Sequence, residues 1–431
     1  MKTPYPVFTE DMKSTHTILM PNMLPIHFKL IARIMNNYGY RAELLENEGK
    51  SVLDAGLESV HNDTCYPALL VIGQFIDAIE SGKYDTDKLA LLITQTGGGC
   101  RASNYIYLLR KALKQRGWGH IPVISFNFSG LDKEYSFRFT IPMMTQLLYS
   151  LMLGDLIMLL YNQCSPYELT TGDTVRAEAA ALEYAYSLFA RGKPLSGKRV
   201  RKAYIHILEL FAAVERSGGE KIKVGIVGEI YVKYAPIANN HLEDFLRSMD
   251  AEVVVPGLVD FCMYCIANVI FDRELYGGRL LKASIFRIAY RVFLKKQREL
   301  AGIIKKHGVF APPPLFGDTI EAAKDYISLG VKMGEGWLLT AEMVELIASG
   351  VENIVCAQPF GCLPNHIAGK GVMRRIKENN PRANIVAVDY DPGATRINQE
   401  NRIKLMLSVA ARNRQAQADE KQSGKTEPAL V

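Results

Sequence analysis

The chain has 431 residues, a formal net charge of +6, 48% hydrophobic and 22% charged residues, and seven cysteines. This length allows two or three domains that each bury a core, and the composition excludes a disordered, collagen-like or coiled-coil chain. The mild positive charge permits an anionic ligand but does not indicate a nucleic-acid-binding protein. An odd number of cysteines does not suit a secreted disulfide scaffold and points to metal or redox chemistry in a reducing compartment.

The N-terminal segment is polar, so we expect no signal peptide, no membrane attachment and a cytoplasmic location. The apolar stretch 141–161 has the length of a membrane span, but Gln146, Ser150 and Asp155 interrupt it. No basic cluster lies just outside either end of it. We therefore expect a buried helix there.

The first third of the chain alternates between short apolar strands and helices. Strands are predicted at 17–22, 40–45, 89–94 and 123–128, and helices at 25–38, 65–81 and 101–115. Short apolar strands separated by helices indicate a parallel sheet that is covered on both faces.

The rest of the chain interrupts this pattern and then resumes it. From about 142 to 218 the sequence shows helical periodicity, at 178–190 and 200–215, and no strand pattern. Strands are then predicted at 223–228, 251–255, 353–357 and 384–389, with helices at 239–248, up to about 307, at 319–329 and 340–349, and from 367 and 394.

These elements predict an α/β fold with two flavodoxin- or Rossmann-like parallel-sheet domains. We expect an N-terminal α/β domain at 1–140, a helical insert at 141–220 and a C-terminal α/β domain with a helical insertion at 221–413. The polar segment 414–431 is predicted to be a disordered tail.

Three cysteines lie where open α/β sheets bind ligands, outside the carboxyl ends of the strands. Cys100 follows the strand at 89–94, Cys362 follows the strand at 353–357, and Cys65 opens the helix at 65–81. A helix N-terminus lowers the pKa of a cysteine toward the thiolate, which is the form that binds iron or zinc. One such cysteine is usually a small core residue, but three in Gly- or Pro-marked turns predict a metal or cluster site.

Glycines accompany two of these cysteines. Gly97, Gly98 and Gly99 precede Cys100, and Gly361 precedes Cys362. They allow the backbone to approach a bulky group and to direct N–H donors at cluster sulfurs or phosphates. The three cysteines form no local zinc motif, so they can converge only through the fold.

Other candidates are weaker. Cys262 and Cys265 form a CxxC in an apolar stretch, which suits a buried helical pair better than a cluster ligand, and Cys356 suits a strand core. Glu229 follows a strand and could be a base near the site or a helix cap. Segment 192–199 nearly matches a Walker A motif but ends in Arg199, so any ATP hydrolysis must come from a separate protein.

Five segments resemble one known family. They are HNDTCYPA (61–68), QTGGGCRASNY (95–105), GIVGEIYVKY (225–234), QPFGCLPNHIAGKG (358–371) and VDYDPGATRINQENRIKLML (388–407). In this order they resemble 2-hydroxyacyl-CoA dehydratase subunits and, more closely, the activase-related proteins homologous to those subunits. The resemblance covers about residues 15–412.

The resemblance implies a [4Fe–4S] cluster in the interdomain cleft, held by Cys65, Cys100 and Cys362, with the fourth iron open. In the dehydratases, which are lyases, such a cluster receives an electron from a separate ATP-dependent activator and transfers it to an acyl-CoA thioester. The resemblance therefore implies the activator, an acyl-CoA and a homo- or heterodimer partner.

Two other functions fit the same scaffold. A related branch of the family carries a double-cubane iron–sulfur cluster and reduces small molecules. The other function is that of a non-catalytic subunit, which binds a cluster and relays electrons or assists assembly. The sequence leaves the choice between a lyase, a reductase and a non-enzymatic role open, and the acyl group unspecified.

Overall fold

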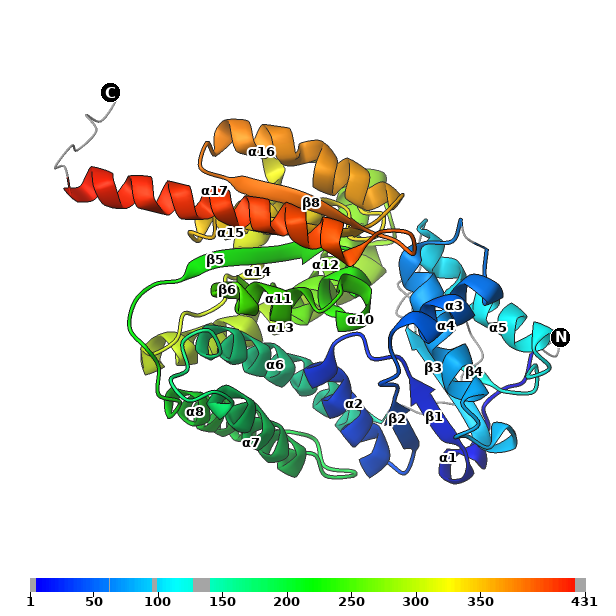
Figure 1. The fold of residues 1–431 in the computed structure, drawn as a ribbon. Helices are drawn as coiled ribbons and strands as arrows, with labels where there is room; N and C mark the ends of the chain where they lie inside the picture. The colour runs from blue at the N-terminus through cyan, green and yellow to red at the C-terminus, as the bar shows by residue number, and fades with distance from the viewer. Residues whose placement is uncertain (1–4, 62, 95–98, 127–139, 423–431) are drawn as a thin grey trace.

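The computed structural model describes residues 5–61, 63–94, 99–126 and 140–422. Two four-stranded parallel sheets form its framework (Figure 1), as the alternation of strands and helices predicted. The strand order is β2-β1-β3-β4 in the N-terminal sheet and β6-β5-β7-β8 in the C-terminal sheet. Both orders match the first four strands of the flavodoxin-like 2-1-3-4-5 arrangement, whose order reverses beside its first strand.

The N-terminal sheet is built from short strands with buried side chains; in β3, five consecutive residues are buried. Its elements are α1 (Met12–Thr15), β1 (Thr17–Met20), α2 (Pro25–Asn37), β2 (Arg41–Leu44), α3 (Lys50–Ser59), α4 (Tyr66–Glu80), η1 (Thr86–Lys88), β3 (Leu89–Thr94), η2 (Arg101–Asn104), α5 (Tyr105–Gln115) and β4 (Val123–Phe126). Helix α3 was not predicted from the sequence. It packs directly on α4 through glycines: a Cβ at Gly73 would lie 2.1 Å from the carbonyl oxygen of Val52.

A helical segment follows, with α6 (Ile141–Cys164), α7 (Asp173–Leu188) and α8 (Gly197–Ala212). Among the described residues, α6 is the one helix long and apolar enough to cross a membrane, and 61% of its most apolar window is buried. Its polar residues have partners inside the protein, since Asp155 Oδ1 lies 2.8 Å from His27 Nε2 on α2. This arrangement agrees with the buried helix expected at 141–161.

The C-terminal half repeats the sheet and adds a long helical insertion. Its elements are β5 (Ile222–Gly228), α9 (Ile230–Tyr234), α10 (Pro236–Asn239), α11 (Leu242–Ser248), β6 (Ala251–Val254), α12 (Leu258–Tyr276), α13 (Leu280–His307), α14 (Phe316–Lys324), α15 (Trp337–Ala348), β7 (Asn353–Pro359), η3 (Asn365–Gly369), η4 (Lys370–Val372), α16 (Met373–Asn379), β8 (Asn384–Tyr390) and α17 (Arg396–Gln422).

Two features of this half differ from the expectations. The helical stretch ending near 307 is two helices, because α12 ends at the left-handed Gly277 (φ 72°). The segment expected to be disordered from 414 continues as helix α17 to Gln422, and the last turns of α17 project away from the sheet (Figure 1). Alanine, glutamine and arginine favour helix in this segment. Residues 423–431 lie outside the described part of the chain.

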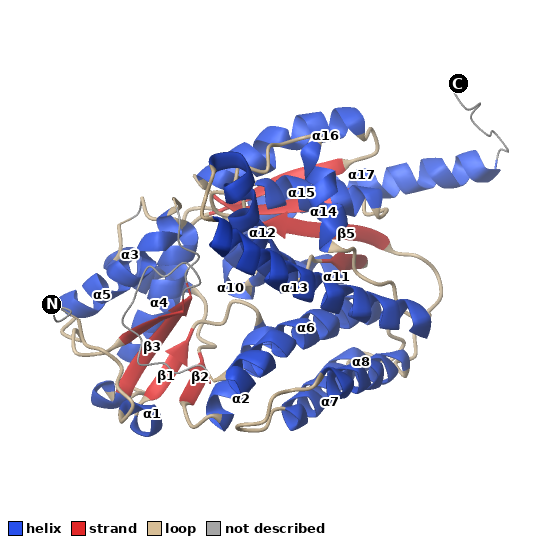
Figure 2. Ribbon diagram, turned by 180° about the vertical axis from the view of Figure 1, so that it is seen from behind, coloured by secondary structure: helices blue, strands red, loops and turns tan. Residues whose placement is uncertain are grey.

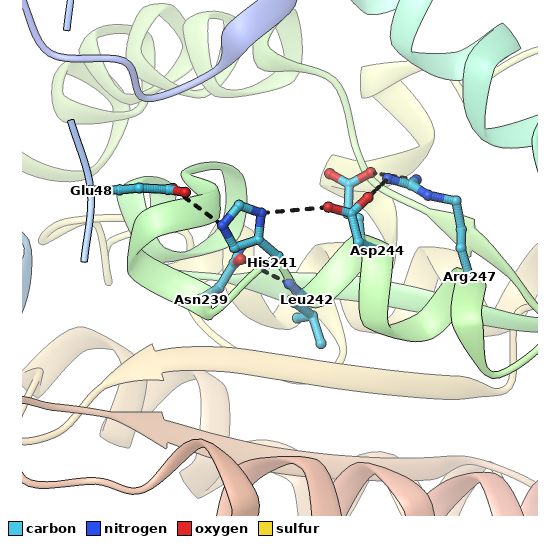
Figure 3. A network of polar contacts seen from close by, with 7 residues as sticks. Glu48, Asn239, His241, Leu242, Asp244 and Arg247 are labelled. Carbon is cyan, nitrogen blue, oxygen red and sulfur yellow. Dashed lines mark hydrogen bonds and ion pairs between the residues drawn. The ribbon is translucent and has the colours of Figure 1, made fainter. Parts of the chain in front are cut away.

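The two halves share one hydrophobic core, which includes buried residues from β1 to α17. Figure 2 shows the helices that cover the sheets from the opposite side. A polar contact adds to this packing: His241, just before α11, has Nε2 3.2 Å from Glu48 Oε2 of the β2–α3 loop and Nδ1 3.5 Å from Asp244 Oδ2 (Figure 3). The halves are therefore joined by both apolar and polar contacts.

Candidate metal centre

The turns that carry Cys100 and Cys362 meet at the loop before α15, and Cys65 is near enough to Cys100 to be affected by its charge. Cys65 is the N-cap of α4, Cys100 is the N-cap of η2, and Cys362 lies between β7 and η3. A Cβ at Gly99 would lie 2.7 Å from Met333 Sδ, and a Cβ at Gly334 would lie 3.0 Å from Pro364 Cγ. The loop 333–335 therefore touches both the turn before Cys100 and the turn after Cys362.

One carboxyl group, that of Glu229, is near enough to raise the pKa values of all three thiols. Burial is the main cause that raises the pKa of Cys65 to about 11, and both Glu229 and Cys100 add to it. Burial also raises the pKa values of Cys100 and Cys362, and Glu335 and Glu229 raise both further. Cysteines from segments far apart in the sequence thus share one electrostatic environment.

Each sulfur has hydrogen-bond donors around it. Cys65 Sγ lies 2.8 Å from the Tyr105 hydroxyl, and the backbone N–H of Ala68 also reaches it. The side-chain amide of Asn365 donates to Cys362 Sγ at 3.3 Å. Backbone N–H groups of residues 101 and 102 reach Cys100, and that of residue 365 reaches Cys362. Such donors stabilise negatively charged sulfur in a thiolate or a cluster.

The expected direction of the cysteine pKa values was wrong. We expected the helix N-termini at Cys65 and Cys100 to lower them, but all three thiols have raised pKa values. Burial and two neighbouring carboxyls outweigh the helix-terminal N–H groups. In the metal-free chain the thiols are therefore protonated at neutral pH, so a metal must displace their protons when it binds.

The half-buried Glu229 pairs with the buried Glu335 at the start of α9. Glu229 Oε2 accepts the N–H of Val232 at 2.9 Å, and Glu335 Oε1 accepts the N–H of Ile230 at 3.0 Å. Burial, followed by the charge of Glu335, raises the pKa of Glu229 to about 8, and burial raises that of Glu335 as well. Glu229 is thus a helix cap, one of its two predicted roles, and this carboxyl pair holds a proton at neutral pH.

Two neighbouring features fix Glu229 in place. Gly228 has φ 149°, and a Cβ there would lie 1.8 Å from the carbonyl oxygen of Ala357 on β7. One helical turn after Glu229, Lys233 Nζ donates to Glu342 Oε1 at 2.9 Å, and both side chains are 3% exposed. Lys233 lowers the pKa of Glu229 and so partly offsets the effect of burial.

Four glycines near the cysteines were predicted to approach a cluster, and the structure describes only two of them. Gly97 and Gly98 lie outside the described residues. Gly99 faces the flexible side chain of Met333 closely, so a side chain at this position would have to displace Met333. Gly361 adopts φ 73°, and its N–H donates to His366 Nε2 at 3.2 Å. A direct approach of these glycines to a cluster remains a prediction.

Sequence reasoning missed Glu335. Glu335 lies between Gly334 (φ 58°) and Gly336 (φ 43°), so a carboxylate between two left-handed glycines was the available signal. Cys265 lies with Cys262 on α12, as the predicted helical pair, and burial followed by Glu335 raises its pKa to about 12. Cys356 is fully buried in β7, as expected.

The described residues form no ready-made site for a single metal ion. Within the described ranges, no three His, Cys, Asp or Glu side chains are close enough to hold one metal ion. A [4Fe–4S] cluster held by Cys65, Cys100 and Cys362 stays a prediction. The buried Asn365 Oδ1 has no partner among the described atoms, while its amide nitrogen is directed at Cys362.

No protein-family model and no curated protein sequence matches this chain.

Proposed function

We propose that this chain is an iron–sulfur protein of the 2-hydroxyacyl-CoA dehydratase-subunit type, with a [4Fe–4S] cluster between its two α/β halves. The observation that supports this proposal best is that one carboxyl, that of Glu229, acts electrostatically on Cys65, Cys100 and Cys362 together. Three thiolates are suitable ligands for such a cluster, and when bound it supplies one-electron and Lewis-acid chemistry at its open iron.

The residues of the chain have distinct roles in this proposal. Tyr105 and Asn365, with the N–H groups that follow each cysteine, orient and stabilise the sulfurs. The Glu229–Glu335 pair holds one proton beside them and exchanges it as the charge of the site changes. The substrate in this proposal is an acyl-CoA thioester, and the electron comes from a separate ATP-dependent activator in the cytoplasm.

Iron and sulfide analysis after anaerobic purification or reconstitution tests the proposal. We expect about four irons per chain and a charge-transfer absorbance that each of Cys65→Ala, Cys100→Ala and Cys362→Ala removes. Cys164→Ala is the matched control, because Cys164 is buried at the end of α6 and its thiol donates to the Phe211 carbonyl. The cluster is ruled out if the chain takes up no iron, or if the three substitutions leave its absorbance spectrum unchanged.

A double-cubane reductase is the second candidate, because Glu335 also raises the pKa of Cys265, which adds a fourth thiol to this region. That function requires about eight irons and more than three cysteine ligands. Loss of half or more of the iron in Cys265→Ala would favour it over the single cluster.

A further inference from the structure

Helix α13 has apolar side chains on two opposite faces. One face packs on the core through its buried residues, which are Ala283, Gln297, Leu300 and Ile304. On the opposite face four apolar side chains are exposed to solvent, and we call them the α13 stripe: Leu281 (75% exposed), Ile285 (56%), Ile288 (63%) and Val292 (46%). A helix that is apolar on both sides is expected to be covered on both.

The spacing of the α13 stripe is that of a coiled-coil seam. Its members follow one another at intervals of four, three and four residues, which are the a and d positions of consecutive heptads. The stripe is narrow, because positions just beside it carry Lys282, Arg291 and Lys295. A single partner helix fits such a narrow seam, whereas a helix lying in a lipid surface presents a broader apolar face.

The charge beside the stripe indicates the kind of partner. Residues 280–298 include six lysines and arginines and no acidic residue. Within that segment, Arg287 pairs with Glu274 at 3.0 Å and Lys296 pairs with Glu299 at 2.9 Å. A second copy of this helix would bring like charges together, while an acidic helix would be attracted.

Further exposed apolar side chains lie at the end of α12, just before α13, and in the loop that contacts Gly99. At the end of α12, Leu275 and Tyr276 are exposed, and a Cβ at Gly330 would lie 3.4 Å from Leu275 Cδ1. The loop that contains Gly330 continues to Met333, which is 51% exposed and contacts Gly99 beside Cys100. Exposed apolar side chains thus occur from α13 to the rim of the candidate metal centre.

We propose that the α13 stripe is the docking surface for a separate protein that presents an acidic amphipathic helix, packed on α13 as a two-stranded coiled coil. The proposal depends on the exposed seam and its charge alone, and it holds whether or not the chain carries a cluster.

A synthetic helical peptide with Leu at a and d and Glu at e and g tests the proposal on the full-length chain. The matched peptide carries Lys at e and g. We expect the acidic peptide to bind at least about tenfold more tightly than the basic one, to weaken with added salt, and to protect the amides of 280–295 from hydrogen exchange. Ile288→Glu should weaken this binding at least about tenfold.

Leu405→Glu is the control variant, because Leu405 is equally exposed (68%) but lies on α17. It should leave peptide binding unchanged, and thermal melts should show both variants folded. Equal binding of the two peptides, or binding that Ile288→Glu does not affect, overturns the proposal. Two other results also overturn the proposal, because each assigns the stripe to another occupant. One is a dimer of the chain alone that Ile288→Glu abolishes, and the other is binding to phosphatidylserine vesicles that Ile288→Glu abolishes.

Discussion

Replacing Glu229 by glutamine should make the metal-free chain more stable above neutral pH. The Glu229 carboxyl has its pKa raised from 4.5 to about 8, first by burial and then by Glu335. The pKa of Glu229 is higher in the folded chain than in the unfolded chain. The stability linked to this carboxyl is therefore fully present below about pH 4.5 and is lost as the pH rises through 8. The raised pKa corresponds to a loss of roughly 5 kcal/mol at most.

Glutamine keeps the size of the side chain and an oxygen for the N–H of Val232, but it cannot ionise. Urea unfolding of the metal-free, reduced chain at pH 5 and pH 8.5 measures the effect. The free energy of unfolding of the wild-type chain should fall relative to Glu229→Gln by roughly 2–5 kcal/mol over this range. Parallel pH profiles for the two proteins would refute the reasoning.

Glu168→Gln provides a control of opposite sign. Partial burial raises the pKa of Glu168, but the N–H groups of Gly172 and Thr174 lower it more, and the net value is below the ordinary one. The stability that this group contributes is present above its unfolded-state pKa and is lost on acidification. The Glu168→Gln chain should therefore lose stability relative to wild type at pH 7, not gain it.

Three further changes test other parts of the structure. Lys233→Met should lower the free energy of unfolding by about 3–5 kcal/mol, because it leaves Glu342 buried without its ion pair. The double variant Lys233→Met/Glu342→Leu should recover most of that loss in the same denaturation assay. Gly73→Ala should destabilise the chain by about 1–3 kcal/mol or more, since its Cβ would meet the backbone of α3. As a control, Gly302→Ala should raise the free energy of unfolding by about 0.5–1 kcal/mol, because Gly302 has open space around it. Tyr105→Phe removes the hydroxyl that faces Cys65 Sγ and should slow alkylation of this thiol, measured by mass spectrometry against unchanged labelling of Cys362.

Most of the strands could be predicted because they are short apolar runs with turns on both sides. The run Leu89–Thr94 is a strand with the predicted bounds, and Asn353–Pro359 extends its prediction by two residues. Helix α3 (Lys50–Ser59) escaped prediction because much of its surface is polar and its contact with α4 depends on glycine, which has no hydrophobic signature. Pattern alone identifies side-chain burial better than close backbone contact.

At the candidate site, position along the chain was more informative than chemistry. The turns after strands led to Cys100, which follows β3 of the N-terminal sheet, and to Cys362, which follows β7 of the C-terminal sheet, because α/β sheets bind ligands outside the carboxyl ends of their strands. The protonation of the thiols could not be predicted, since it depends first on burial and, for Cys100 and Cys362, also on Glu335, which comes from a loop with no strand or helix pattern. Local helix-terminus effects were predictable, but the stronger effect of burial is set by the tertiary structure.

The close contact at Gly228 links the chemistry of the site to the geometry of the sheet. Any side chain at this position would force β5 away from β7 and move the next residue, the carboxylate that acts electrostatically on the thiols, in the same step. Natural or designed variation therefore cannot adjust that carboxylate by small changes of its own strand. Changes of geometry at the candidate site would come more readily from the loops at 99–100 and 333–335, which lie outside the strands.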